Sequence, residues 1–516
     1  MDPWRSSSDS DAVSTLEPVT TPPGESADSD AVQDEAERLK PDEVRRRATR
    51  GIAQLAARGV AIRALGFIGN IVLATLLTPS DFGAVAIGTT VLVFVTLISD
   101  GGLGAALVRG DHRPTRLMFE QLLGFQLAIA VGVTLVAVGL APFFGRTGWI
   151  TAVMTASFCV AVFRSSGFVQ LDRNLMFRQV AIIEVIEMTA YLTWAIGAVL
   201  LGAGVWGLAT ASVARAIVAT GFVLRAAPMR VLRPRFRLTE IRPVLGFGVR
   251  FQAINLVGLL RDQGLNVGIA AVSGLGTLGI WSMAYRFIQI PFLLFDSLWR
   301  VTFPAMARLI EAGEDPRPAV ENMLTRSAVV TGAMLCTLVG ATPALIPAVF
   351  DPQWHPIVDV LPWACAGLLV GGPISVSVAG FLFARGDATT ALRGAVVHTI
   401  AALSIALALL PVIGITALGL GVFASAFVEG VVLGIRAARG YQIGIIRPLL
   451  VPIVMGVAGG AAGWAAAALL MPHIVGAVVG GAVAITVFVG GVALLSPSAL
   501  RETIDMARRS LRAAPA

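Results

Sequence analysis

Arginines inside apolar stretches are the residues of this sequence whose chemistry is most informative. Arg261 and Arg286 lie in two consecutive apolar runs, where a guanidinium at a helix centre costs roughly 2.5–3.5 kcal/mol of insertion free energy. A guanidinium stays charged at any relevant pH and matches phosphate oxygens with two parallel hydrogen bonds. The pair therefore predicts a cationic site for a lipid pyrophosphate or an acidic sugar. The alternative is that these arginines only neutralise nearby carboxylates and backbone carbonyls.

Helical spacing predicts which of these charges share a face. Arg250 and Arg261 are eleven residues apart, which corresponds to a net rotation of about 20° and a rise of roughly 16 Å. Arg286 and Arg300 fall within about 40° of each other, and Asp296 lies one turn from Arg300. Counting from the ends of the two runs puts Arg261 and Arg286 at comparable depths. Arg250 and Arg300 lie near the cytoplasmic boundary, where snorkelling to headgroups is the alternative explanation.

Four further polar residues complete the expected substrate-binding set. Asp262 follows Arg261 directly, and Arg63 lies about 18 Å inside the first apolar run, with Asn70 two turns further on. Asp100 precedes two glycines, where a helix could either break and open backbone groups to a cavity or end in an ordinary cap. Other charges inside the apolar runs are expected to pair within or between helices: Arg164, Glu184, Glu187, Arg215 and Glu429. The histidines lack ligand spacing, so neither a metal site nor a catalytic constellation is expected.

The elements that carry these residues are predicted to be transmembrane helices. The 516 residues are 56% hydrophobic and only 14% charged, with a mean hydropathy of +0.80, so a bilayer must solvate much of the surface. Apolar runs of 20 or more residues recur, each long enough to cross a core of roughly 30 Å. The expected fold class is therefore all-α, a polytopic membrane protein. Fourteen spans are expected, at about 51–76, 82–108, 117–142, 150–171, 179–201, 205–226, 244–271, 277–303, 325–349, 358–384, 389–411, 415–437, 446–470 and 474–496.

Basic residues predict the orientation of these spans. If the N-terminus is cytoplasmic, the arginine-rich loops all follow even-numbered spans, whereas the opposite loops carry only Arg146. Both termini are therefore expected on the cytoplasmic side of an inner (plasma) membrane. Residues 1–43 have a net charge of −9 and a composition typical of a disordered tail, so the membrane part is the basic part.

An internal repeat predicts how the spans are grouped. Gly83 and Gly279 are 196 residues apart, and so are Asp100 and Asp296. This offset covers six spans, so the two copies have the same orientation and are related by an axis along the membrane normal. We expect two six-helix bundles around a central cavity plus two C-terminal helices. The expected domains are an acidic tail at 1–43, a first half at 44–240, a second half at 241–440 and an appendage at 441–516.

One segment of the chain resembles a known family. Residues 73–109 read LATLLTPSDFGAVAIGTTVLVFVTLISDGGLGAALVR, with the pattern Leu-Leu-Thr-Pro, then Asp-Phe-Gly, then Asp-x-Gly-Leu-Gly-x-Ala-Leu-Val. This segment resembles the opening of oligosaccharide flippases of the multidrug/oligosaccharidyl-lipid/polysaccharide exporter superfamily, in the branch that exports colanic-acid or teichuronic-acid type units. Beyond residue 110 the resemblance rests on the number of spans, the arginine-rich loop between spans six and seven, and the sequence near residue 285.

The resemblance implies a transporter rather than an enzyme. A member of this family carries an undecaprenyl-diphosphate-linked saccharide across the inner membrane by alternating access, without a nucleotide-hydrolysing domain. The sequence agrees, because its only lysine, Lys40, lies in the tail and no phosphate-loop motif is present. Expected partners are the lipid-linked saccharide, membrane lipids, and the polymerase and glycosyltransferases of the same pathway, with no nucleic acid and no cofactor. The alternatives are a drug/cation antiporter of the same superfamily and a non-transporting scaffold for polysaccharide synthesis.

Overall fold

The computed structural model describes residues 41–100, 115–174, 176–227, 233–237, 239, 242–470 and 472–513. The chain divides into two units at residues 53 and 54, and residues 54–516 form the larger, compact unit. The acidic tail expected over residues 1–43 lies outside the described residues as far as residue 40. The description below concerns the larger unit.

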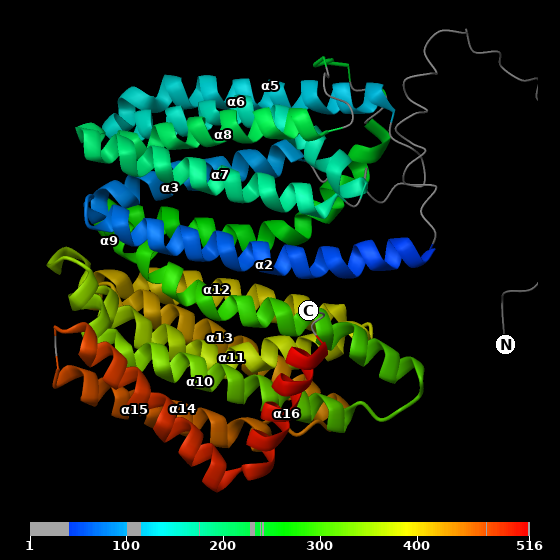
Figure 1. Cartoon of the computed structure of the whole chain (residues 1–516), viewed down its shortest axis with the longest axis vertical. Coiled ribbons are helices and arrows are strands. Elements are labelled where there is room, and N and C mark those ends of the chain that lie inside the picture. The colour runs from blue at the N-terminus through cyan, green and yellow to red at the C-terminus, as the bar shows by residue number, and fades with distance from the viewer. Residues whose placement is uncertain are drawn as a thin grey trace, which may run out of the picture. The chain divides into compact units, whose positions relative to one another are not determined.

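The described chain is all-α, as predicted, and contains fourteen α-helices (Figure 1). Eleven stretches of it are long and apolar enough to cross a membrane. The chain is therefore a polytopic membrane protein. The helices are α2 (Pro41–Ala74), α3 (Pro79–Asp100), α5 (Arg116–Leu140), α6 (Gly145–Arg173), α7 (Phe177–Ala198), α8 (Trp206–Ala226), α9 (Arg242–Glu311), α10 (Arg317–Val349), α11 (Ile357–Ala384), α12 (Ala388–Ile413), α13 (Thr416–Tyr441), α14 (Ile446–Ala468), α15 (Ile474–Leu495) and α16 (Pro497–Ala513).

Each predicted span overlaps one helix of the series α2–α15, except that α9 contains two of them. Gly274 interrupts α9 with φ 82° and ψ 177°, a conformation that favours glycine, so the helix has a first segment before it and a second segment after it. One of the eleven apolar stretches, Arg116–Arg173, likewise contains both α5 and α6, joined by a short 3₁₀ turn. The number of fourteen spans stays a prediction. The amphipathic helix α16 was not expected as a helix.

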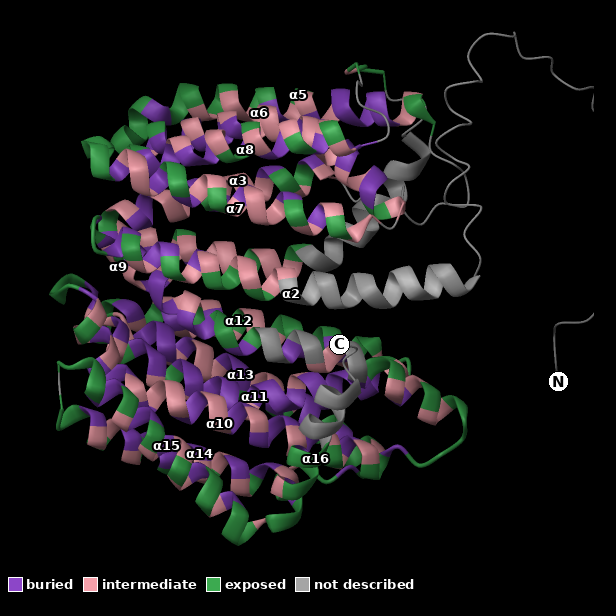
Figure 2. Cartoon of the chain, in the orientation of Figure 1, coloured by how far each residue is buried: buried purple, intermediate pink, exposed green. Residues whose placement is uncertain are grey.

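The helices pack in two sets that share α9. In the first set, α5 contacts α6, α6 contacts α3 and α8, and α7 contacts α8. In the second set, α11 contacts α10, α12, α13 and α14, while α10 contacts α14 and α15 (Figure 1). Helix α9 contacts α3 from the first set and α11 and α12 from the second. Buried residues concentrate on α11, which lies inside the second set (Figure 2).

Two glycines bring α3 and the second segment of α9 together in a reciprocal contact. A Cβ atom on Gly83 would lie 1.9 Å from the carbonyl oxygen of Leu275, and one on Gly279 would lie 1.7 Å from the carbonyl oxygen of Pro79. Any larger residue would collide with backbone, so the approach requires glycine at both positions. Leu275 and Gly279 each follow Pro79 and Gly83 by 196 residues, so the offset seen in the sequence reappears as a symmetric contact.

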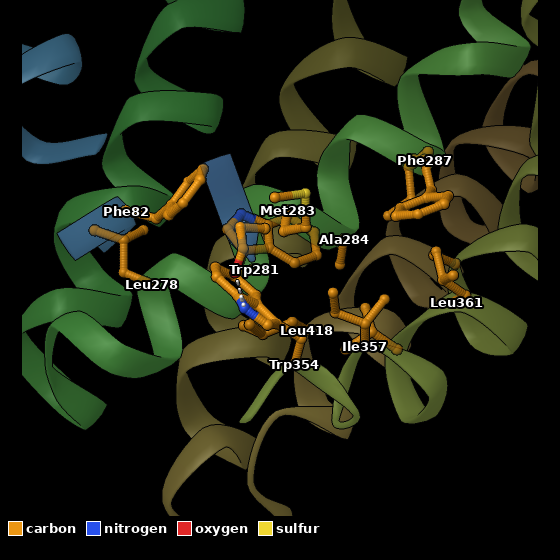
Figure 3. Packing of buried hydrophobic residues seen from close by; sticks show 14 of the residues in the cluster. Phe82, Leu278, Trp281, Met283, Ala284, Phe287, Trp354, Ile357, Leu361 and Leu418 are labelled. Carbon is orange, nitrogen blue, oxygen red and sulfur yellow. Dashed lines mark hydrogen bonds between the residues drawn. The ribbon is translucent and has the colours of Figure 1, made fainter. Parts of the chain in front are cut away.

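An apolar cluster lies beside this glycine contact (Figure 3). Phe82 packs edge-to-face against Trp354 with ring centroids 5.1 Å apart, and the Trp354 indole N–H donates to the carbonyl oxygen of Ala74 at 3.0 Å. Phe67 of α2 packs in the same way against Phe287 of α9. These contacts join α2 and α3 to the second set of helices at the end of the molecule where α3 begins.

Candidate functional site

The first cavity, of about 900 Å³, lies among the helices of the first set. Its lining comes mainly from α3, α6, α7 and α8, with single residues from α2, α5 and α9. The polar lining residues are Thr89, Thr96, Asp100, Gln126, Ser157, Arg164, Ser165, Glu184, Glu187, Ser212 and Arg215. Charged groups within apolar helices are rare and costly, so this cavity is the first candidate functional site.

Glu187 is the centre of a charge cluster on the wall of the first cavity. One of its carboxylate oxygens accepts from Arg164 of α6 and the other accepts from Arg215 of α8. The Glu187 side chain is 5% exposed, whereas that of Arg215 is 46% exposed. Two guanidiniums share one carboxylate, so the cluster carries one net positive charge beside the cavity.

A second ion pair lies nearby on the same wall. The Arg58 Nε atom of α2 lies 2.7 Å from a carboxylate oxygen of Glu184, one turn before Glu187 on α7. The expectation that Arg164, Glu184, Glu187 and Arg215 pair between helices is therefore confirmed. The arginine side chains point from three different helices to one stretch of α7, and this fixes the spacing of those helices.

The second cavity, of about 490 Å³, lies among α9, α11, α12 and α13. Arg261 and Asp262 line it and pair with each other at 2.7 Å. On the opposite wall, His398 Nδ1 lies 2.8 Å from a carboxylate oxygen of Glu429, which confirms that Glu429 is paired. The wall formed by the second segment of α9 is aromatic, with Trp281, Tyr285, Phe292, Phe295 and Trp299.

Three polar side chains join the two cavities. The hydroxyl of Thr90 on α3 donates to the Gln263 amide oxygen at 2.7 Å, and the Asn266 amide nitrogen donates to Thr90 at 3.3 Å. Thr89 lines the first cavity, whereas Gln263 and Asn266 line the second. The cavities therefore lie on either side of the contact between α3 and α9.

The structure separates the two arginines that the sequence groups together. Arg261 lines the second cavity, but Arg286 is absent from the described lining of either cavity and lies close enough to Tyr191 of α7 to interact with it electrostatically. Tyr191 also interacts with Arg215 of the first-cavity cluster. The buried Nε atom of Arg286 has no hydrogen-bond partner among the described residues. Adjacent positions on a helix point about 100° apart, so Tyr285 faces the second cavity while Arg286 faces α7.

The other predicted site residues have varied surroundings. Asp100 lines the first cavity, at the end of the described part of α3, and the proposed helix break after it lies outside the described residues. Asn70 is buried and donates to the carbonyl oxygen of Gly66 on its own helix. Arg63 is exposed on α2, one residue after Ile62, which lines the first cavity. The side chains of Arg250, Asp296 and Arg300 lie outside the described residues.

Sequence reasoning did not assign the aromatic wall to a site. Tyr285, Phe292 and Trp299 follow one another at intervals of seven residues, a spacing that places them on one helical face. That period was the available signal. The same period occurs on the packed face of an ordinary helix, so only the structure, which shows a cavity beside this face, identifies it as a wall of a site.

Comparisons with known proteins agree with this architecture. Residues 72–359 match the family model described as polysaccharide biosynthesis protein. The succinoglycan biosynthesis transport protein ExoT of Rhizobium meliloti (strain 1021) is 27% identical over 59% of this chain and 62% of its own length. The chain thus matches less than two thirds of that relative. The lipopolysaccharide biosynthesis protein WzxC of Escherichia coli (strain K12) is 23% identical over 64% of this chain and 69% of its own length.

Solved structures show the same fold. The lipid II flippase MurJ in an inward closed conformation matches with a TM-score of 0.69 and 11% identity, over 85% of this chain and 98% of its own. An inward-facing multidrug resistance transporter of the MATE family matches with a TM-score of 0.56 and 13% identity, over 76% of this chain and 98% of its own. The chain therefore belongs to the polysaccharide biosynthesis protein family, the oligosaccharide flippase and polysaccharide exporter group that the segment at residues 73–109 resembles.

Proposed function

We propose that this protein is a flippase that moves a lipid-linked oligosaccharide or polysaccharide repeat unit from the cytoplasmic to the outer face of the plasma membrane. The observation that carries the proposal is the Arg164–Glu187–Arg215 cluster on the wall of the first cavity, in a chain of the polysaccharide biosynthesis family. An undecaprenyl diphosphate linker is the anion that such a transporter has to carry. The ion pair with Glu187 uses the Nε atom of Arg215, and the half-exposed Arg215 side chain has further N–H donors for a phosphate.

Alternating access is the proposed mechanism. The two sets of helices would be six-helix halves, spans one to six and seven to twelve, that rock about the α3–α9 contact. Helices α14 and α15, which pack on α10, would be the two additional spans. The arginine distribution along the loops supports a cytoplasmic location for both termini. The apolar cluster around Phe82 and Trp354 would then close the outer end of the path.

The antiporter alternative receives less support from the charge pattern. A drug/cation antiporter needs carboxylates in its cavity that can bind a cation or a proton. Glu184 and Glu187 in the first cavity already pair with arginines, and Glu429 in the second pairs with His398. The arginine–carboxylate clusters suit an anionic substrate better.

Reconstitution into liposomes with lipid-linked sugars of defined structure tests this proposal. We expect the unmodified protein to move such a lipid across the bilayer, and Arg215→Ala to slow that movement roughly tenfold or more, because each charge-assisted hydrogen bond to phosphate contributes about 1.5–3 kcal/mol. Arg215→Lys should restore part of the rate, since it keeps the charge but loses the planar fork. Arg286→Ala and Arg261→Ala test the arginines singled out by the sequence in the same assay.

Arg439→Ala on the exposed end of α13 is the matched control, because it removes an arginine that lies far from both cavities along its helix. It should leave the transport rate unchanged. If Arg215→Ala inserts normally and transports at the full rate, the anion site is wrong. If the unmodified protein moves no lipid-linked saccharide, the function itself is wrong.

A further inference from the structure

One wall of the second cavity is formed by aromatic side chains that belong to neither of its ion pairs. Tyr285, Phe292 and Trp299 line it at seven-residue intervals, which corresponds to about 20° of net rotation and a rise of about 10 Å per step. Phe292 is 37% exposed, although an aromatic ring within a helix core is ordinarily covered. Three rings thus form a ladder roughly 21 Å long on one face of α9.

Glycine and aromatic packing hold this wall in place. A Cβ atom on Gly372 of α11 would lie 2.2 Å from the ring of Phe295, so the glycine lets α9 seat closely against α11. Phe295 in turn packs edge-to-face against Phe292, and Trp299 packs edge-to-face against Phe383. Phe292 and Trp299 are therefore each held by a neighbouring aromatic ring.

The rest of the lining is rich in side chains that can donate or accept hydrogen bonds. Amides, a guanidinium, carboxylates, an imidazole and hydroxyls face the same space: Arg261, Asp262, Gln263, Asn266, Gln289, Ser375, His398, Ser425 and Glu429. A sugar ring has a C–H face, which packs on the electron-rich face of an aromatic ring, and a rim of hydroxyls that each need a hydrogen-bond partner when they leave water. The cavity offers both kinds of contact.

The charges of the second cavity disfavour phosphate. The Arg261–Asp262 pair is neutral, and the His398–Glu429 pair is negative or neutral, according to the protonation of the histidine. A diphosphate placed there would meet no excess of positive charge. The lining of the first cavity also includes Asp100 and Glu184, but at the cluster two arginines share the single carboxylate of Glu187, so the charged part of a substrate is favoured at that cluster.

The two cavities are placed to hold one molecule. They flank the Thr90–Gln263–Asn266 hydrogen bonds between α3 and α9. Tyr285 is eleven residues, or about 16 Å, from the Gly274 break, and Arg215 is nine residues, or about 14 Å, from the start of α8. If both helices begin at the same membrane face, the arginine cluster and the aromatic wall lie at the same depth.

We infer that the second cavity is a carbohydrate subsite, in which sugar rings of the lipid-linked substrate stack on Tyr285, Phe292 and Trp299, while the diphosphate lies at the Arg164–Glu187–Arg215 cluster. This inference rests on the proposed function. It adds that the two halves of the protein recognise different parts of the substrate. The saccharide specificity of the protein would therefore be set by α9, α11, α12 and α13.

Binding of two probes to the full chain in lipid nanodiscs tests the subsite. The probes are a polyprenyl diphosphate without sugar and the same lipid bearing a disaccharide. Phe292→Leu, which keeps the apolar volume but removes the π face, should weaken binding of the disaccharide lipid about 3- to 10-fold and change binding of the sugar-free lipid less than twofold. Trp299→Leu should act in the same way. Arg215→Ala should weaken binding of both lipids.

Phe222→Leu on α8 is the matched control, since Phe222 is 41% exposed and lines neither cavity among the described residues. It should bind both probes as the unmodified protein does. Equal weakening of both probes by Phe292→Leu would overturn the subsite. So would a disaccharide that adds no affinity to the unmodified protein, although the proposed function would then stand. If neither lipid binds the unmodified protein, the proposed function fails and the subsite fails with it.

Discussion

Buried charges in this protein are organised around carboxylates that accept from more than one helix. Glu187 binds Arg164 and Arg215, and in doing so ties α7 to α6 and α8. Removal of one member leaves the others inside the protein without a counter-charge, which is the costly change in such a cluster. The cluster is therefore both a feature of the cavity and a support for the first set of helices.

Replacing Glu187 tests this double role. Glu187→Gln should lower the free energy of unfolding by about 1–3 kcal/mol, because the guanidiniums of Arg164 and Arg215 then repel each other without a shared carboxylate. The loss is kept to this range because the side chain of Arg215 is half-exposed to solvent. The loss should be smaller when Arg164→Gln is present as well, with a coupling free energy of about 0.5–3 kcal/mol. Thermal unfolding of the purified protein measures both. Strictly additive losses would show that Glu187 and Arg164 do not act as a unit.

The sequence indicates which residues are charged inside the membrane, but not where each one points. Pairing could be expected for Glu187 because an unpaired carboxylate in an apolar helix is unfavourable. Its partners, however, come from helices 23 and 28 residues away along the chain, and tertiary packing decides that choice. Arg261 and Arg286 were expected at comparable depths, yet they face different neighbours because they lie on the two segments of α9 before and after Gly274.

The start of α12 is fixed by a local side chain. Asp387 begins α12 and accepts from the backbone N–H of Thr390 at 3.3 Å and from Arg436 of α13 at 2.8 Å. The same carboxylate accepts from the hydroxyl of Tyr441 at 3.4 Å. One residue in a short turn thus caps one helix and joins it to the end of another.

The Asp387 cap leads to a prediction for stability and its pH dependence. Asp387→Ala should lower the free energy of unfolding by about 0.5–2 kcal/mol, which thermal unfolding in detergent measures. The hydrogen bond from Arg436 lowers the pKa of Asp387, so its stabilisation is present above the ordinary carboxyl pKa of about 4 and is lost as the pH falls through the lower folded value. Asp315→Ala, which removes an exposed pair with nearby Arg317, is the control and should have little effect. An equal loss in both variants would contradict the role of the cap.

Helix α9 shows where prediction of elements from sequence succeeds and where it ends. The turn at Ser273–Gly274 and the two apolar runs around it were readable, because glycine and hydropathy act locally. The aromatic wall could not be predicted, because seven-residue periodicity indicates which residues share a helix face but not whether that face packs against another helix or lines a cavity. Helix α16 was also missed, since its apolar positions alternate with arginines that resemble a basic tail.

The larger unit, residues 54–516, has a contact between α3 and α9 in which both partners use the same pair of positions. Gly83 and Gly279 each lie against a carbonyl oxygen of the other helix where no side chain would fit, and the apolar cluster around Trp354 lies beside them. The 196-residue offset was readable in the sequence, but the sequence did not show that the two copies meet each other there. A symmetric contact of this kind can open and close by a small relative rotation of its two helices.

Gly83→Ala tests whether this contact is the outer gate of the transport path. The added methyl group would collide with the carbonyl oxygen of Leu275, so the closed contact should lose about 1–3 kcal/mol and the outward-open population should rise roughly tenfold or more. The reporter is Ser375→Cys on the wall of the second cavity, in a background in which Cys159→Ala removes the half-buried native thiol. The measurement is the rate at which a membrane-impermeant thiol reagent, added from the outer side, labels this cysteine. Gly276→Ala, where a Cβ atom would meet nothing within 4 Å, should leave the rate unchanged. Equal acceleration by both alanines would assign the effect to helix propensity instead of the contact, and labelling only from the cytoplasmic side would reverse the proposed orientation of the gate.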